Sequence, residues 1–261
     1  MSENILEINN LSKYFGGLAA VSECSLKVKK GTITGIIGPN GSGKTTLFNL
    51  IAGNLKSSAG SVMFNNENIT DVPSYELFSK GLLRTFQIAH EFTNLSVLEN
   101  LMMVPGNQSG EKLMNTFLKP SLVANEEEQI KEKAKEVVEF LNLSHLSNEL
   151  AGNLSGGQKK LLELGRTMMV DAKLVLLDEV GAGVNRTLLK DLGTAIEKLN
   201  KEKGYTFCMI EHDMDFIGRL CDPVIVMAEG SVLFEGTVED AKKNEKVIES
   251  YLGRGSKLKD N

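Results

Sequence analysis

The chain has 261 residues, of which 41% are hydrophobic, so it can bury a substantial core as one large domain or as two lobes. Its formal net charge of -5 provides no overall positive field, and we therefore expect no nucleic-acid partner. Three cysteines, Cys24, Cys208 and Cys221, lack the close spacing of zinc or redox pairs and are expected to be reduced and buried.

The first residues carry no sign of a targeting segment. Residues 1–13 lack the charged start and apolar core of a secretory signal. No apolar run approaches the roughly 18 residues of a membrane-spanning helix. We therefore expect a soluble protein of a reducing compartment, which reaches a membrane only through a partner.

The chain begins with the pattern of a small antiparallel sheet. Residues 5–28 and 61–69 alternate loosely between apolar and polar side chains, and Asn65 and Asn66 are candidates for a turn. Further short apolar segments predict strands at residues 32–37, 174–177, 205–210 and 224–227. Apolar residues recur at spacings of three and four in residues 45–51, 158–170 and 188–203, which predicts helices. Because strand and helix alternate, we predict an α/β fold with a parallel core sheet.

Residues 89–153 differ from this alternation and predict a helical insertion. One helix is expected to contain Phe92, Leu95, Leu98, Leu101 and Met102. The apolar face of a second one is expected to consist of Ile130, Ala134, Val137, Val138 and Leu141.

A phosphate-binding loop follows the strand predicted at residues 32–37. Its residues are Gly38, Pro39, Asn40, Gly41, Ser42, Gly43, Lys44 and Thr45, followed by Thr46. Glycines let backbone N–H groups turn towards phosphates at the positive end of the next helix. Lys44 can reach the β and γ oxygens, and Thr45 can ligate Mg²⁺. The weaker alternative is a glycine turn that only joins strand to helix.

Two carboxylates follow the strand predicted at residues 174–177. Asp178 stands where a magnesium-holding aspartate is expected, and Glu179 is expected to face the γ-phosphate and an attacking water. An ordinary acidic turn is the alternative. Residues 200–203, Asn-Lys-Glu-Lys, lack the aspartate that reads guanine, so adenine is favoured as the base.

A second phosphate-binding turn is suggested by Leu154, Ser155, Gly156, Gly157 and Gln158. Ser155 could simply cap the following helix. That interpretation leaves the two glycines unexplained, because each costs about 1 kcal/mol relative to alanine in a helix. Bare backbone at this place would allow an anion to approach.

With these motifs in this order, the chain resembles the ABC transporter ATPases from about residue 6 to residue 252. The resemblance implies one ATPase domain over residues 1–261, with a P-loop NTPase (RecA-like) core, an antiparallel β subdomain and an inserted α-helical subdomain. The β and RecA-like core would comprise residues 1–88 and 154–240, and the helical subdomain residues 89–153. Residues 241–261 would form a C-terminal helix and a mobile tail.

The resemblance also assigns roles to individual residues. In this family two ATPase domains face each other, so Ser155, Gly156, Gly157 and Gln158 would complete the ATP site of a partner. Gln87 would reach Mg²⁺ and couple the lobes, and His212 would contact the γ-phosphate. Phe15 would stack on adenine; Tyr14 is the rival, and either could instead belong to the sheet core.

The segment at residues 181–185 corresponds to the family's D-loop, which touches the opposite subunit. Val180 and Arg186 replace two prolines that are common beside it. Without those fixed φ angles the turn is expected to be looser.

Within the family, the chain looks like the ATP-binding subunits of branched-chain amino-acid importers. The similar stretches are residues 84–87, 91–143, 211–214 and 247–253. Subunits for urea or amide uptake, a lipopolysaccharide exporter and a soluble iron–sulfur assembly ATPase remain alternatives. The resemblance implies Mg-ATP, a second copy or a paralogue, membrane permease subunits and a solute-binding protein as partners, at the cytoplasmic face of the cell membrane.

Docking to a permease is expected to involve the helical insertion. The segment at residues 87–91 is the better candidate for direct contact. A group of apolar residues could either dock or pack, and we expect core positions for most of them: Phe92, Leu95, Leu98, Met102 and Met103.

Overall fold

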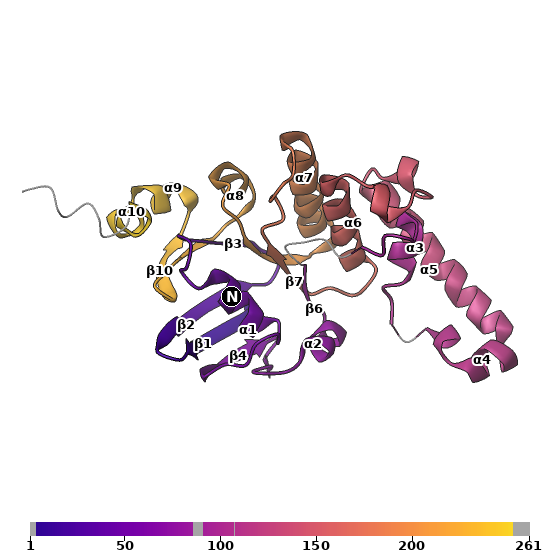
Figure 1. Ribbon diagram of the computed structural model, residues 1–261, viewed down its shortest axis with the longest axis horizontal. Helices are drawn as coiled ribbons and strands as arrows, with labels where there is room; N and C mark the ends of the chain where they lie inside the picture. The colour runs from indigo at the N-terminus through magenta and orange to yellow at the C-terminus, as the bar shows by residue number, and fades with distance from the viewer. Residues whose placement is uncertain (1–3, 86–90, 107, 253–261) are drawn as a thin grey trace, which may run out of the picture. The chain divides into compact units, whose positions relative to one another are not determined.

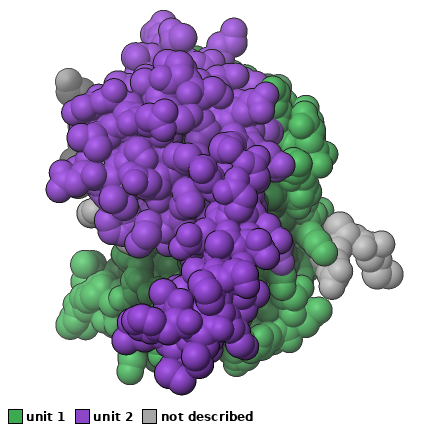
Figure 2. Space-filling model, turned by 90° about the vertical axis from the view of Figure 1, so that its right-hand side faces the viewer, with its two compact units in different colours: residues 1–84, 173–181, 196–261 green, residues 85–172, 182–195 purple. Residues whose placement is uncertain are grey.

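The computed structural model describes residues 4–85, 91–106 and 108–252. The chain divides into two compact units (Figure 2). One consists of residues 1–84, 173–181 and 196–261, and the other of residues 85–172 and 182–195. Both sheets belong to the first unit, and the described helices α3 to α6 belong to the second.

A six-stranded sheet forms the centre of the first unit (Figure 1). Neighbouring strands are parallel except at the edge, where β10 runs antiparallel to β9. Every residue of β3, β7 and β8 is buried, as expected for strands covered on both faces. In spatial order the strands are β10 (Ser231–Gly236), β9 (Val224–Ala228), β3 (Ile33–Ile37), β8 (Thr206–Ile210), β7 (Leu174–Asp178) and β6 (Leu82–Arg84).

The smaller sheet of this unit is antiparallel, as predicted. Its strands lie in the order β2 (Leu18–Lys29), β1 (Asn4–Phe15), β4 (Ala59–Phe64) and β5 (Glu67–Asn68). Leu6 pairs with Val28 on one side and with Phe64 on the other. Asn65 and Asn66 have φ values of 50° and 64°, which is the geometry of a tight hairpin turn, so the predicted turn is confirmed.

Helix α1 (Lys44–Ile51) packs into a core that both sheets share. Its Leu47 and Phe48 are fully buried in one cluster with Leu6 of β1 and Ile36 of β3. The other helices of this unit are α2 (Ser74–Lys80), α8 (Met214–Leu220), α9 (Val238–Lys243), α10 (Glu245–Leu252) and the second half of α7 (Arg186–Lys203). This packing fixes the start of α1 beside the end of β3.

The second unit is built from helices. They are α3 (Val97–Met102), α4 (Leu113–Leu118), α5 (Pro120–Phe140), α6 (Gly156–Met168) and the first part of α7, with short 3-10 turns at residues 109–111, 144–146 and 151–153. Ala134, Val137, Val138 and Leu141 are buried, which confirms most of the apolar face predicted for α5.

The predicted first helix of the insertion begins later than expected. Ser96 caps α3 by accepting the N–H of Glu99, whose carboxylate accepts the N–H of Ser96, so the helix starts at Val97. Phe92 and Leu95 precede it. Phe92 is 48% exposed and Met103 60% exposed, and the other three residues of the group, Leu95, Leu98 and Met102, are only half-buried. The expectation of core positions for most of the group was therefore wrong.

Several short elements were not predicted, among them β6, β10, α2 and α8. The three cysteines are free and buried. No helix in residues 4–85, 91–106 and 108–252 combines the length and the hydropathy needed to cross a membrane. The expected mobile tail, from residue 253 onward, lies outside the described residues.

Candidate active site

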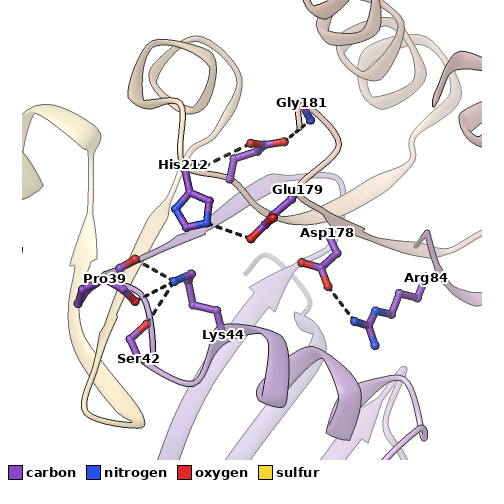
Figure 3. Close-up of polar contacts among 10 residues, drawn as sticks. Pro39, Ser42, Lys44, Arg84, Asp178, Glu179, Gly181 and His212 are labelled. Atoms are coloured by element: carbon purple, nitrogen blue, oxygen red, sulfur yellow. Dashed lines mark hydrogen bonds and ion pairs between the residues drawn. The ribbon is translucent and has the colours of Figure 1, made fainter. Parts of the chain in front are cut away.

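The phosphate-binding loop is the turn between β3 and α1. Residues 38–43 form the turn, and Lys44, Thr45 and Thr46 are the first residues of the helix. The buried Lys44 Nζ donates to the carbonyl oxygens of Gly38, at 2.8 Å, and of Pro39, at 3.0 Å (Figure 3). Burial lowers the pKa of Lys44, and the carboxylates of Glu179 and Asp178 oppose this effect.

Two glycines of the loop are required by the fold itself. Gly38 has φ of 149°, and a Cβ atom there would lie 2.1 Å from the carbonyl oxygen of Met227. Gly43 has φ of 97°, and a Cβ atom there would lie 2.3 Å from the carbonyl oxygen of Ala20. A side chain at either position would force the loop away from the strands that support it.

Asp178 and Glu179 emerge from the end of β7 in different environments. The Asp178 side chain is only 4% exposed, and the Glu179 side chain is 22% exposed. Glu179 has φ of 50°, a left-handed backbone that costs a residue with a side chain on the order of 1 kcal/mol. Its N–H still donates to Ile210 of β8, at 2.9 Å. The two consecutive carboxylates have different partners: Asp178 pairs with Arg84, and Glu179 pairs with His212.

His212, just after β8, faces Glu179. Its Nε2 lies 3.0 Å from Glu179 Oε1, so a hydrogen on Nε2 bonds to the carboxylate (Figure 3). The structure therefore brings four predicted residues together in the first unit, namely Lys44, Asp178, Glu179 and His212. They gather at the carboxyl ends of parallel strands, where ligands of open α/β sheets bind.

Glu211 was not predicted as a site residue, yet it organises this edge of the sheet. Its buried carboxylate accepts the N–H of Gly181 at 2.6 Å and the N–H of His212 at 3.3 Å. Burial raises the pKa of Glu211, against the effect of these two amides. The signal in the sequence was an acidic residue between an apolar strand and His212.

Arg84, at the end of β6, is the second residue that sequence analysis did not place in the site. Its Nη2 donates to Asp178 Oδ2 at 2.8 Å (Figure 3). Its Nη1 donates to Asn49 Oδ1 at 2.6 Å. One guanidinium thus joins the strand that ends at Arg84, the helix of the phosphate loop and the buried carboxylate.

The two aromatic candidates for adenine stacking lie at the end of β1. Phe15 is 49% exposed and Tyr14 is 48% exposed, so the sheet-core alternative was wrong for both. Lys13 Nζ lies 5.3 Å from the centroid of the Phe15 ring. Lys13 Nζ also donates to the carbonyl oxygen of Lys56 at 2.8 Å, so the ammonium group would have to leave the Phe15 ring if a base stacked on that face.

The residues of the second predicted turn belong to the second unit. Ser155 caps α6: its Oγ accepts the N–H of Gln158 at 3.4 Å, and Gln158 Oε1 accepts the N–H of Ser155 at 2.9 Å. A serine hydroxyl that accepts this bond keeps its own hydrogen for another acceptor. Ser155 therefore caps the helix, and its hydroxyl hydrogen can still be donated to a ligand.

Gly156 and Gly157 differ from each other. Gly156 is exposed, and a Cβ atom there would make only an ordinary contact, 3.9 Å from the carbonyl oxygen of Gly183. Gly157 is buried, and a Cβ atom there would lie 2.5 Å from Leu188 Cδ1 of α7. The absence of a side chain at Gly157 is thus required for helix packing, a reason that sequence analysis did not consider.

Residues 181–185 lie between Val180 and Arg186, which replace the two prolines common in the family, and hydrogen bonds from side chains hold this segment. Glu211 binds the N–H of Gly181, and Asn185 Oδ1 accepts the N–H of Leu188 at 3.0 Å in the first turn of α7. Arg186 therefore starts the helix without a proline. Gln87, the remaining predicted site residue, lies outside the described residues.

The sequence pattern of the ABC transporter family matches residues 21–182, which include the phosphate loop, residues 154–158 and both carboxylates of β7. The chain belongs to the ABC transporter family. This ABC transporter chain is accordingly a nucleotide-binding ATPase whose activity is coupled to transport.

Relatives match the ABC transporter chain over almost its whole length. The probable branched-chain amino acid transport ATP-binding protein LivG of Archaeoglobus fulgidus is 45% identical over 249 residues, which cover 95% of each protein. The high-affinity branched-chain amino acid transport ATP-binding protein BraF of Pseudomonas aeruginosa is 36% identical over 253 residues, covering 97% of this chain and 99% of BraF.

Solved ABC transporter cassettes share the fold. A nucleotide-free cassette matches with a TM-score of 0.83 at 41% identity, over 96% of this chain and 100% of the other. A cassette in its ADP conformation matches with a TM-score of 0.83 at 40% identity, over 97% and 100%. The predicted P-loop NTPase fold is confirmed.

Proposed function

We propose that this ABC transporter ATPase powers the import of branched-chain amino acids through membrane permease subunits. The observation that carries the proposal is the 45% identity to a branched-chain amino acid transport ATP-binding protein over 95% of both chains. The site supports it, because the lysine, both carboxylates and the histidine of the motifs meet in one place.

The phosphate loop would hold the triphosphate of ATP. Lys44 and the loop amides bind the phosphates, with Thr45 and Thr46 in the first turn of α1. Phe15, or Tyr14, stacks on the adenine ring. Lys44 already lies within the loop, so nucleotide binding requires only a local shift of its ammonium group.

The residues present fit Mg²⁺. Thr45 offers an exposed hydroxyl and Asp178 a carboxylate, which are the oxygen ligands that Mg²⁺ prefers. Within the described residues, no cluster of three His, Cys, Asp or Glu side chains could hold a metal ion. A site with so few protein ligands suits a metal ion that also binds phosphates. When bound, Mg²⁺ would neutralise charge on the β and γ phosphates, with Gln87 as a further ligand.

Glu179 and His212 would serve the attacking water. The Glu179 carboxylate accepts a hydrogen bond from the water and orients it towards the γ-phosphorus. His212 holds that carboxylate through Nε2 and faces the place of the γ-phosphate. Glu211 fixes the backbone beside both groups, because it binds the amides of Gly181 and His212.

The second phosphate-binding turn would act on the ATP of a partner. In a head-to-tail pair, Ser155 Oγ, the amides of Gly156 and Gly157, and Gln158 would complete the opposite γ-phosphate site. The exposed Gly156 and the spare hydrogen of Ser155 support this role. The partner is a second copy or a paralogous ATPase subunit, and ATP binding closes the pair.

The second unit would carry the contact with the permease. Four side chains of α4 leave between 69% and 81% of their surface exposed: Leu113, Met114, Phe117 and Leu118. Phe92 and Met103 are exposed as well. Apolar surface of this extent is what a protein partner covers. Through the permease the ATPase would sit at the cytoplasmic face of the membrane, in one complex with a solute-binding protein.

The proposal is tested by purifying an affinity-tagged chain from membranes of its own cells. We expect permease subunits and a solute-binding protein to copurify, and the bound solute to be a branched-chain amino acid. Capture of urea, an amide or lipopolysaccharide would show that branched-chain amino acids are not the transported substrate. A chain that is recovered without any membrane subunit would reject the transport role and favour a soluble ATPase of the iron–sulfur assembly type.

A further inference from the structure

Arg84 occupies an unusual position for a charged side chain. It is the last residue of β6 and the last residue of the first unit before the chain enters the second. Its side chain is only 11% exposed. A guanidinium is rarely buried to this degree unless its hydrogen bonds compensate for the lost hydration.

The compensation comes from two acceptors on different elements. Nη1 donates to Asn49 Oδ1 of α1 at 2.6 Å, and Nη2 donates to Asp178 Oδ2 of β7 at 2.8 Å. The planar guanidinium therefore has a fixed orientation, because two of its nitrogens are held at once. Asn49 is the second anchor, that is, the second acceptor that holds the guanidinium in this orientation.

One donor of the Arg84 guanidinium takes no part in these contacts. Arg84 Nε is buried and has no hydrogen-bond partner among the described residues. An unpaired buried donor costs about 1–3 kcal/mol. In this orientation Nη1 and Nη2 reach Asn49 and Asp178 together, and the guanidinium keeps its bond to the Asp178 carboxylate although Nε gains no bond among the described residues.

The contact with Arg84 also determines which oxygen of Asp178 can bind another ligand. Oδ2 is engaged by Arg84, and the part of the chain that the structure describes makes no other hydrogen bond to this carboxylate, so Oδ1 can meet another ligand. With one oxygen held, the carboxylate cannot rotate freely about its own bond. Asp178 is thus presented in one orientation beside Lys44 and Glu179 (Figure 3).

We propose that Arg84 is a positioning residue for the metal site, which fixes Asp178 so that one carboxylate oxygen faces the Mg²⁺ of bound nucleotide. This inference rests on the nucleotide and metal binding of the proposed function. Arg84 would act through Asp178, the carboxylate to which it is bonded. Partners of metal ligands typically change metal affinity by about 10–100-fold when they are removed.

The test measures binding, without hydrolysis. A fluorescent ADP analogue is titrated onto wild type, Arg84→Met and Arg84→Lys in EDTA and at increasing MgCl₂, and Mn²⁺ binding in the presence of ADP is followed by electron paramagnetic resonance. We expect Arg84→Met to bind the analogue in EDTA like wild type and to need about tenfold more Mg²⁺ or Mn²⁺. Arg84→Lys keeps the positive charge but cannot donate from two nitrogens at once, so its metal requirement is expected to lie between those of wild type and Arg84→Met.

Two further variants separate positioning from stability. Lys80→Met removes the Lys80–Glu67 ion pair elsewhere in the same unit and is expected to leave the metal requirement unchanged. Asn49→Ala removes the second anchor and is expected to raise the metal requirement by a few-fold. It keeps the test decisive if Arg84→Met does not fold.

The outcomes distinguish the two proposals. If Arg84→Met and Asn49→Ala melt at a lower temperature but bind Mn²⁺ and Mg²⁺ like wild type, Arg84 only ties β6 to its neighbours and the inference is wrong. If wild type binds nucleotide without any metal dependence, both this inference and the metal site of the proposed function are wrong. If the variants need more metal as expected but a solute other than a branched-chain amino acid copurifies, the inference about Arg84 stands and only the proposed substrate is wrong.

Discussion

At the scale of single residues, the site depends on side chains that were difficult to recognise in the sequence. Lys44, Asp178, Glu179 and His212 stand at motif positions, and the structure places them near one another. Glu211 and Arg84 could not be assigned in the same way. Arg84 and Asp178 are 94 residues apart in the chain, and their contact depends on the neighbouring positions of β6 and β7, which no local pattern encodes.

Glu211 is expected to make the stability of the protein depend on pH. Burial raises its pKa above the ordinary 4.5, so the folded protein holds this proton more tightly than the unfolded chain. The contribution of Glu211 to the free energy of unfolding is complete at pH values below its ordinary pKa and is lost as pH rises through its raised pKa. Glu211→Gln keeps an acceptor for Gly181 without titrating.

The measurement compares denaturant unfolding of wild type and Glu211→Gln from about pH 5 to about pH 8. The free energy of unfolding of wild type should fall relative to the variant as pH rises. Two curves that stay parallel over the whole range would show that Glu211 does not titrate differently in the folded protein.

At the scale of elements, strands and long helices followed from periodicity, whereas boundaries depended on capping. Residues 5–28 and 61–69 were correctly predicted to lie in an antiparallel sheet, with a turn at Asn65-Asn66, but the division of residues 5–28 into β1 and β2 was not predicted. The start of α3 was missed although Ser96 and Glu99 have the spacing of a capping box, because the apolar spacing of Phe92 and Leu95 was given more weight. β6 has three residues, too few for any period to show.

The two capping boxes allow a matched test of Ser155. Ser155→Ala and Ser96→Ala each remove a cap in the second unit, and each should lower the free energy of unfolding by about 1 kcal/mol. In a permease-bound preparation, only Ser155→Ala should also reduce ATP hydrolysis, because only Ser155 meets the partner's nucleotide. Equal hydrolysis by the two variants would leave Ser155 as a helix cap alone.

At the scale of the whole molecule, one phosphate loop in the first unit and one capped glycine turn in the second suggest a catalytic centre shared between subunits. Lys44→Ala disables the loop of one subunit, and Ser155→Arg blocks the turn of another. A mixed pair would contain one composite site with both defects and one with none.

We therefore expect inactive permease-bound Lys44→Ala and Ser155→Arg proteins to recover ATP hydrolysis when they are coexpressed. About a quarter of the wild-type rate is the statistical expectation for random pairing of subunits with independent sites, because half of the pairs are mixed and each has one intact site of two. Mixtures that stay inactive, although mass spectrometry detects mixed pairs, would mean that each site belongs to a single subunit.

The contact between Gly157 and Leu188 changes how genetic data on this turn should be interpreted. Any larger residue at position 157 would press on the beginning of α7 and displace Asn185, which lies just before that helix. Loss of transport in such a mutant would therefore arise from a distorted helix pair as readily as from a missing phosphate contact. At Gly156 a Cβ atom would meet only the carbonyl oxygen of Gly183, at an ordinary contact distance of 3.9 Å, so a small substitution there reports on the approaching nucleotide with less disturbance of the helices.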